Sequence, residues 1–437
     1  MAADSQVERE LRPPQVSGPF VPGKLRLDAI DVMRGLVMVI MALDHVRDYM
    51  SFAQPTPEHW TTTSLALWLT RWITHFCAPA FVFLAGTGAY LSYARHGDVA
   101  RTSRFLWTRG LWLVFAEYTI IGFGWSFLFP FGFAQVIWVI GWSMVINSFL
   151  IRLPLRWVAA FGALLVAGHN LLDYIQPPGG FANFGKVPWY WVLFHTQGFI
   201  PVKPPAFLHV PPNFPFGIFV VYPLIPWVGV MSLGFVFGAV LRRAAAERQR
   251  WMLRAGAALT AAFVVLRAFN LYGNPKTLAA AGPDIDATFH LQPTLAKTFI
   301  LFTDVEKYPP SLQFLLMTLG PTLLLIALFD RMKIDGAGLG NAVARFFVVF
   351  GRVPFFYYVL HLYVVHLLAY FAALATGQPA HWLLRGAMFA NPLPAGYGHH
   401  LPFLYATWAL AIAILYFPCR WFMHLKQRRR DWWLSYL

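Results

Sequence analysis

Long apolar segments restrict the fold of this sequence more than any other feature. A helix needs about 20 mainly apolar residues to cross a membrane, and ten segments meet that need. They are too long and too uniformly apolar for the alternating strands of a membrane β-barrel. The ten segments cover residues 29–49, 66–94, 104–129, 133–152, 155–175, 216–241, 251–270, 311–330, 354–376 and 401–423. The sequence therefore predicts an all-α, polytopic bundle of about ten transmembrane helices.

Charged residues are too few to cover a soluble surface. They make up 12% of the 437 residues, and hydrophobic residues make up 58%, whereas soluble domains contain about 25% charged residues. This composition excludes a soluble enzyme and a disordered chain. Cys77 and Cys419 lie in apolar runs and lack the spacing of a zinc site or a disulfide framework. We therefore expect no metal.

The net charge of +15 is explained by membrane topology. If residues 1–25 form a disordered cytoplasmic tail, 23 of the 34 Lys and Arg residues fall on the cytoplasmic side and six on the outer side. Basic residues accumulate in cytoplasmic loops, so we expect both termini inside and no nucleic-acid binding. We expect residues 26–437 to form a single domain with long outer loops at 176–215 and 271–310.

Ionisable residues in the first predicted span indicate a functional site. One helical stripe about 100° wide carries Asp31, Arg34, His45 and Asp48, while Asp44 lies beside it. His45 lies about 21 Å along the helix from Asp31. Charges within a span are costly and often functional. We interpret the stripe as the lining of a polar tunnel, with a polar interface between helices as the alternative.

Polar side chains recur in three other predicted spans. Arg71 and His75 form an i,i+4 pair on one helix face. Glu117 is a candidate partner for Arg71 or Arg109 in a buried ion pair. His361 shares its helix face with two tyrosines, which leaves a structural and a functional role equally open. No HExxH, GxSxG or Walker motif is present, so metal chemistry, serine hydrolysis and NTP use have no motif support.

The first two predicted spans resemble a known family of membrane enzymes. The segment Arg26–Tyr49 carries the frame R-L-x-x-I-D-x-x-R-G, and Arg71–Ser92 carries a P-x-F-V-F-x-x-G core. Both are similar to the heparan-α-glucosaminide N-acetyltransferase-like proteins, which belong to a wider superfamily of transmembrane acyltransferases. Glu306–Pro321, Gly351–His366 and Leu415–Leu437 resemble the bacterial branch of that family.

This resemblance implies acetyl transfer across a membrane. In the family, acetyl-CoA is used from the cytoplasmic side and the acetyl group reaches an amino sugar on the far side. The family's catalytic histidine lies on the outer side after the first motif helix, and His59, followed by Trp60, is the nearest match. His45 and His75 fall where the sugar enzymes carry asparagine and aspartate. His361 matches a histidine of a late helix.

We therefore expect a multi-pass enzyme of the bacterial inner membrane that moves an acetyl group from acetyl-CoA to an amine or hydroxyl of a glycan or another envelope acceptor. His45 or His59 would act as general base or transient acyl carrier. The candidate catalytic residues are His45, His59, Asp44, His75 and His361, with Asp44 or Asp48 orienting the base. The candidate donor-binding residues are Asp31, Arg34, Arg71, Arg104 and Arg109. A proton-coupled transporter using the same polar channel is the alternative, and a homodimer is the oligomer we consider.

Overall fold

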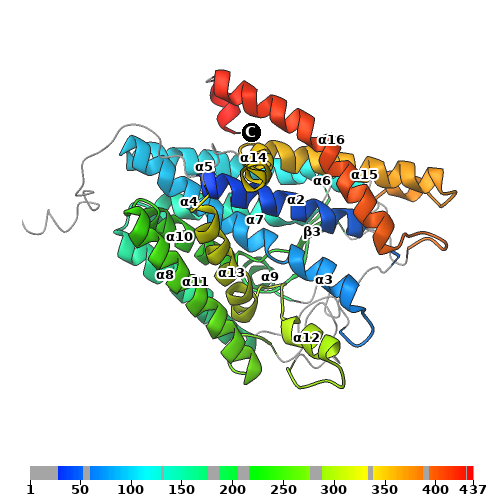
Figure 1. Cartoon of the computed structure of the whole chain (residues 1–437), viewed down its shortest axis with the longest axis horizontal. Coiled ribbons are helices and arrows are strands. Elements are labelled where there is room, and N and C mark those ends of the chain that lie inside the picture. Colours follow the sequence, from blue (N-terminus) through cyan, green and yellow to red (C-terminus); the bar gives the residue numbers. More distant parts are fainter. Residues whose placement is uncertain are drawn as a thin grey trace, which may run out of the picture.

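Helices make up most of the structure and lie side by side in one bundle (Figure 1). The computed structural model describes residues 28–52, 60–128, 132–175, 187–204, 216–275, 288–332, 338–386, 393–429 and 431–436. The expected tail at residues 1–25 and the candidate His59 lie outside these described residues.

Helical segments lie at all ten predicted spans. The long helices are α2 (Asp28–Met50), α3 (Leu65–Thr74), α4 (Cys77–His96), α5 (Val99–Ala116), α7 (Val136–Leu150), α8 (Leu155–Gly168), α10 (Leu224–Val240), α11 (Ala245–Ala268), α13 (Leu312–Phe329), α15 (Pro354–Ala375) and α16 (Leu401–Arg428). A π-helical turn, Glu117–Ile121, and α6 (Gly122–Ser126) continue α5, and a 3-10 segment, His169–Tyr174, continues α8. The prediction of a mainly helical chain is therefore confirmed.

Six segments of the described chain are long and apolar enough to cross a membrane. They are Leu65–His96, Leu155–Tyr174, Ala245–Ala268, Leu312–Phe329, Pro354–Ala375 and Leu401–Arg428. Helix α2 falls outside this group because its ionisable residues are too numerous, although most of its side chains are buried. The total of ten spans stays a prediction.

A small sheet departs from the all-α prediction. Strand β3 (Gly217–Val220) pairs antiparallel with β2 (Gly198–Pro201) and parallel with β1 (Phe133–Ala134). These strands are two to four residues long, so they leave no periodic pattern that a sequence could reveal. Strand β2 and the short helix α9 (Trp189–Phe194) lie within the first predicted outer loop, whereas β1 and β3 occupy the first residues of two predicted spans.

Two further helices lie between the predicted spans. Helix α12 (Leu295–Thr303) forms within the second predicted outer loop. Helix α14 (Leu339–Gly351) matches the amphipathic character of its sequence, and it packs along α2 and α16. A Cβ atom at Gly35 of α2 would collide with the backbone of Phe347, so glycine permits this close helix crossing.

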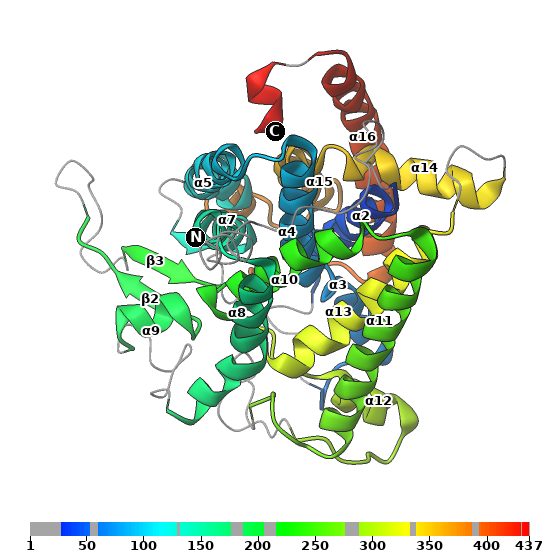
Figure 2. The same ribbon diagram turned by 90° about the vertical axis from the view of Figure 1, so that its left-hand side faces the viewer.

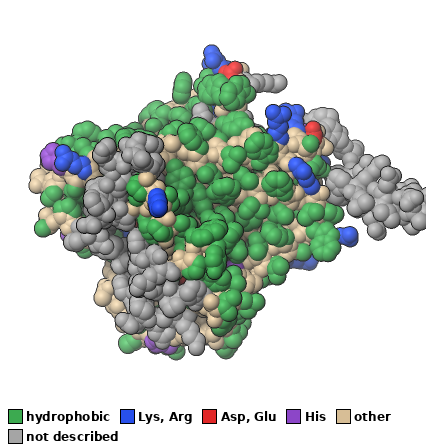
Figure 3. All heavy atoms as spheres, turned by 180° about the vertical axis from the view of Figure 1, so that it is seen from behind, with side chains coloured by type: hydrophobic (Ala, Val, Ile, Leu, Met, Phe, Trp, Pro, Cys, Tyr) green, Lys and Arg blue, Asp and Glu red, His purple; other side chains and the backbone are tan. Residues whose placement is uncertain are grey.

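Apolar side chains cover much of the molecular surface. Figure 3 shows one face made mainly of hydrophobic side chains, with Lys and Arg toward its margins. On α16, Leu410, Ile414, Phe417 and Trp421 are all exposed. Such a surface is unfavourable in water and suits the hydrocarbon core of a bilayer. The chain is thus a multi-pass membrane protein.

Helices α4 and α10 approach closely enough to give a stability prediction. A Cβ atom at Gly86 would collide with the carbonyl oxygen of Met231, whereas a Cβ at Gly88 would have its nearest neighbour, Arg34 Nη2, at 3.8 Å. Because backbone atoms cannot move aside locally, we expect Gly86→Ala to cost about 1–3 kcal/mol. Thermal unfolding in detergent should show a lowered midpoint for Gly86→Ala and an unchanged or raised one for Gly88→Ala. Equal midpoints for the two variants would contradict this helix packing.

Candidate functional site

Helix α2 lies inside the bundle, where α3, α4, α13, α14, α15 and α16 all contact it (Figure 2). Its ionisable residues therefore meet neighbouring helices. They gather at two levels, one near each end of the helix. The two levels are separated by about 17 Å, the rise between Arg34 and His45.

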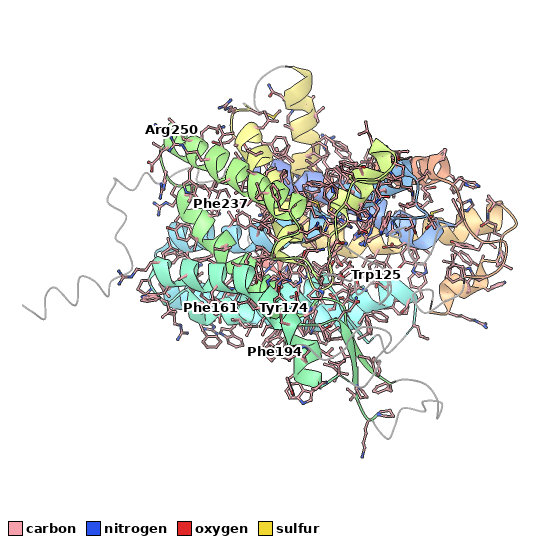
Figure 4. The ribbon with its side chains drawn as sticks, turned by 90° about the horizontal axis from the view of Figure 1, so that it is seen from below. Trp125, Phe161, Tyr174, Phe194, Phe237 and Arg250 are labelled. Atoms are coloured by element: carbon pink, nitrogen blue, oxygen red, sulfur yellow. The ribbon has the colours of Figure 1, made fainter. Side chains whose placement is uncertain are left out.

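A histidine pair lies in the second half of α2. His45 Nδ1 and His361 Nε2 of α15 are 2.7 Å apart, and their rings stack with centroids 4.9 Å apart. His45 is 9% exposed and His361 is fully buried. The rings of Trp125 and His45 meet in a T-shaped arrangement with their centroids 4.6 Å apart. Figure 4 shows Trp125 and Arg250 toward opposite ends of the molecule, so Trp125 marks the end that holds the pair.

The hydrogen bonds of this pair determine where its protons lie. His361 Nδ1 lies 3.1 Å from the carbonyl oxygen of Tyr357, and a carbonyl can only accept. In the neutral pair, His361 therefore donates from Nδ1 and accepts at Nε2. His45 must then donate from Nδ1, which leaves the lone pair of His45 Nε2 available. An imidazole held in this tautomer is suited to accept a proton from a bound molecule.

The residues that precede and follow His45 in the sequence form ion pairs. Asp44 accepts from Arg71 of α3 at 2.6 Å and from Arg47 at 3.1 Å. Arg47 also pairs with Asp48 at 2.6 Å. We call these residues, with the adjacent Lys307, the His45 cluster; its members are Asp44, His45, Arg47, Asp48, Arg71 and Lys307. The helical stripe predicted from the sequence includes Asp48 and leaves Asp44 beside it. In the structure, Asp44 is the residue that links α2 to α3 through its ion pair with Arg71.

Lys307 of this cluster and the neighbouring His75 have mostly buried side chains without hydrogen-bond partners in the described part of the chain. Lys307 is 8% exposed, and its ammonium group lies 5.0 Å from the centroid of the Tyr308 ring. His75 is 4% exposed, and neither of its ring nitrogens has a partner in the described part of the chain. Sequence reasoning placed His75 among the candidates and missed Lys307, which it counted only as an outer-side basic residue.

The donor-binding candidates divide between the two ends of α2. Arg34 contacts Asp31 at 3.5 Å and donates to the carbonyl oxygen of Gly351 at 3.2 Å. Arg109 lies within electrostatic range of Arg34, and Arg104 is exposed on the same helix, α5. Arg71 does not join them, because its ion pair with Asp44 holds it at the His45 end.

The sequence-based prediction that Glu117 pairs with Arg71 or Arg109 is wrong. Its carboxylate does not pair with Arg71 or Arg109; its Oε2 accepts the backbone N–H of Trp138 at 2.9 Å. Trp138 lies in the first turn of α7, where backbone N–H groups lack partners within the helix and attract negative charge. Glu117 therefore caps α7.

Residues 26–268 match the model of the heparan-alpha-glucosaminide N-acetyltransferase family, described as catalytic. The match covers more than half of the sequence. The chain belongs to this family. Membership implies a membrane N-acetyltransferase, and the family uses acetyl-CoA. No curated protein matches the chain.

The matched segment contains His45, Arg71 and His75, but it ends before Lys307 and His361. The pairing of His45 with His361 therefore joins a residue inside the matched segment to one outside it.

Proposed function

We propose that this protein transfers an acetyl group from cytoplasmic acetyl-CoA to an amine or hydroxyl of a glycan or another envelope acceptor. In this proposal it lies in a bacterial inner membrane, with ten spans and both termini in the cytoplasm. The family supports acetyl transfer, and the distribution of basic residues supports this orientation.

The buried His45–His361 pair is the observation that carries the proposal. With its Nδ1 proton held by His361, His45 would use Nε2 to take a proton from the acceptor amine. The amine nitrogen attacks the thioester carbonyl carbon, and the carbon–sulfur bond breaks. The leaving thiolate then takes up the proton, so the products are the N-acetylated acceptor and the free thiol of CoA.

Arg34, Arg104 and Arg109 are the proposed contacts for the phosphates of the donor. Guanidinium groups bind phosphate oxygens in pairs, and an arginine is charged at every physiological pH. These residues lie at the end of α2 opposite to His45, so the donor would extend along α2 toward the histidine pair. Asp31 would help to position Arg34, which it contacts at 3.5 Å.

The test is an assay of purified protein in detergent. Acetyl-CoA is supplied with glucosamine or with a neutral sugar that has only hydroxyl groups, and free CoA thiol and acetylated product are measured. The proposal expects both products to appear together in the presence of an acceptor. Uptake of a solute by proteoliposomes without any CoA release would favour the transporter alternative and contradict the proposal.

A further inference from the structure

The side chain of Lys307 is mostly buried, and none of the described carboxylates lies within ion-pair distance of its ammonium group. The Lys307 side chain makes no hydrogen bond or ion pair with any described residue, and its described contact is with the ring of Tyr308. Its chain neighbour Glu306 instead accepts the backbone N–H of Tyr308 at 2.9 Å. Removing an ammonium from most of its surrounding water without an ionic partner is unfavourable. An anion bound beside Lys307 would offset this cost.

The carboxylates of the His45 cluster do not supply that anion. Lys307 lies within electrostatic range of Asp44, but Asp44 is already held by two arginines. Asp48 is paired with Arg47. The cluster thus has three cationic side chains and two carboxylates, and Lys307 carries the unmatched charge.

His75 gives a second, independent observation at the same place. It lies within electrostatic range of Lys307 and Arg71. Both of its ring nitrogens are buried and lack partners among the described residues, and its ring packs on Phe314 with centroids 5.5 Å apart. A buried imidazole usually has at least one hydrogen bond. His75 can offer an N–H to the same group that Lys307 would bind.

We propose that Lys307 and His75 form a subsite for an anionic group on the acceptor, beside the proton-accepting His45. One unmatched positive charge suits a carboxylate or a singly charged phosphate. The acceptor would then be an acidic amino sugar, with its acid held by Lys307 and its amine presented to His45. This inference rests on the proposed acetyl transfer.

The experiment compares three probes as acceptors: glucosamine, its 6-phosphate, and muramic acid, which is glucosamine bearing a lactyl carboxylate. For the wild type we expect kcat/KM to be at least about 10-fold higher for one acidic probe than for glucosamine, because a hydrogen bond to a charged group is typically worth about 1.5–3 kcal/mol. The preferred probe identifies the acid. In Lys307→Met this preference should disappear, and in Lys307→Arg it should be partly retained.

Lys203→Met is the matched control, because Lys203 is an exposed lysine in another segment of the chain. It should keep the wild-type preference. A Lys307→Met preference equal to that of the wild type would overturn the subsite.

A binding measurement separates failure of the subsite from failure of acetyl transfer. Thermal unfolding is measured without acetyl-CoA in sodium acetate, sodium phosphate or sodium chloride at equal ionic strength. Acetate or phosphate should raise the midpoint of the wild type relative to chloride, and Lys307→Met should lose that shift. An equal shift in both proteins would contradict the subsite even if the protein has no acetyltransferase activity. A shift that needs Lys307 would support the subsite in the same circumstance.

Discussion

Replacing His45 by alanine is expected to lower kcat for acetyl transfer by about 10²–10⁴-fold, the range for removing a general base. The reason is geometric: His45 Nε2 is left with a free lone pair once His361 has fixed the proton on Nδ1. Initial rates of CoA release, normalised to folded protein, measure the effect. Wild-type turnover by His45→Ala would exclude this histidine from the chemistry.

His361 should behave differently, because it acts on the substrate only through His45. We expect His361→Asn to lower kcat while KM for the acceptor stays near its wild-type value. His366 is the matched control, since it is also fully buried on α15 and contacts the carbonyl oxygens of Gly124 and Leu383. His366→Asn should reduce thermal stability but leave turnover per folded molecule largely intact. A common loss of turnover in both variants would indicate a general packing effect.

The second large effect is expected for Asp44→Ala. Asp44 accepts hydrogen bonds from Arg71 and Arg47, and both arginine side chains are buried. Removing the shared carboxylate takes away the ion pair of Arg71 and one of the two ion pairs of Arg47, and breaking a buried ion pair typically costs about 3–5 kcal/mol. Thermal or denaturant unfolding in detergent should show a large destabilisation.

Asp48→Asn provides the comparison for this prediction. The side chain of Asp48 is 33% exposed and pairs with Arg47 on the same helix. Because water screens such a pair, we expect a loss of about 1 kcal/mol or less. An equal loss of unfolding free energy in Asp48→Asn and Asp44→Ala would contradict the view that the Asp44 ion pairs are strong because they are buried.

The sequence predicted the helices well because length and uniform apolarity are local properties. Every predicted span contains a helix. The β1–β3–β2 sheet could not be predicted in this way, since pairing joins Phe133 to Phe219 across a long stretch of chain. Glu117 was assigned the wrong partner because its π-helical turn directs it to the start of α7.

The site was only partly predictable for a similar reason. Helical periodicity placed His45 and Asp48 on one stripe, but α2 has helices on several sides, so Asp44 beside the stripe also meets a partner. His45 and His361 are 316 residues apart, and nothing in the local sequence of either indicates the contact. Lys307 lies within the predicted outer loop 271–310, where a basic residue is not unusual, so nothing in the sequence indicated that it belongs to a buried site.

Acetyl transfer between separated compartments tests the central claim most directly. Proteoliposomes are loaded with glucosamine and muramic acid, acetyl-CoA is added outside, and the contents are analysed by mass spectrometry after removal of external solutes. We predict that trapped N-acetylated sugar appears with the wild-type protein and fails to appear with His45→Ala. Absence of the trapped product with wild-type protein, or equal product with both proteins, would contradict a membrane acetyltransferase that works through His45.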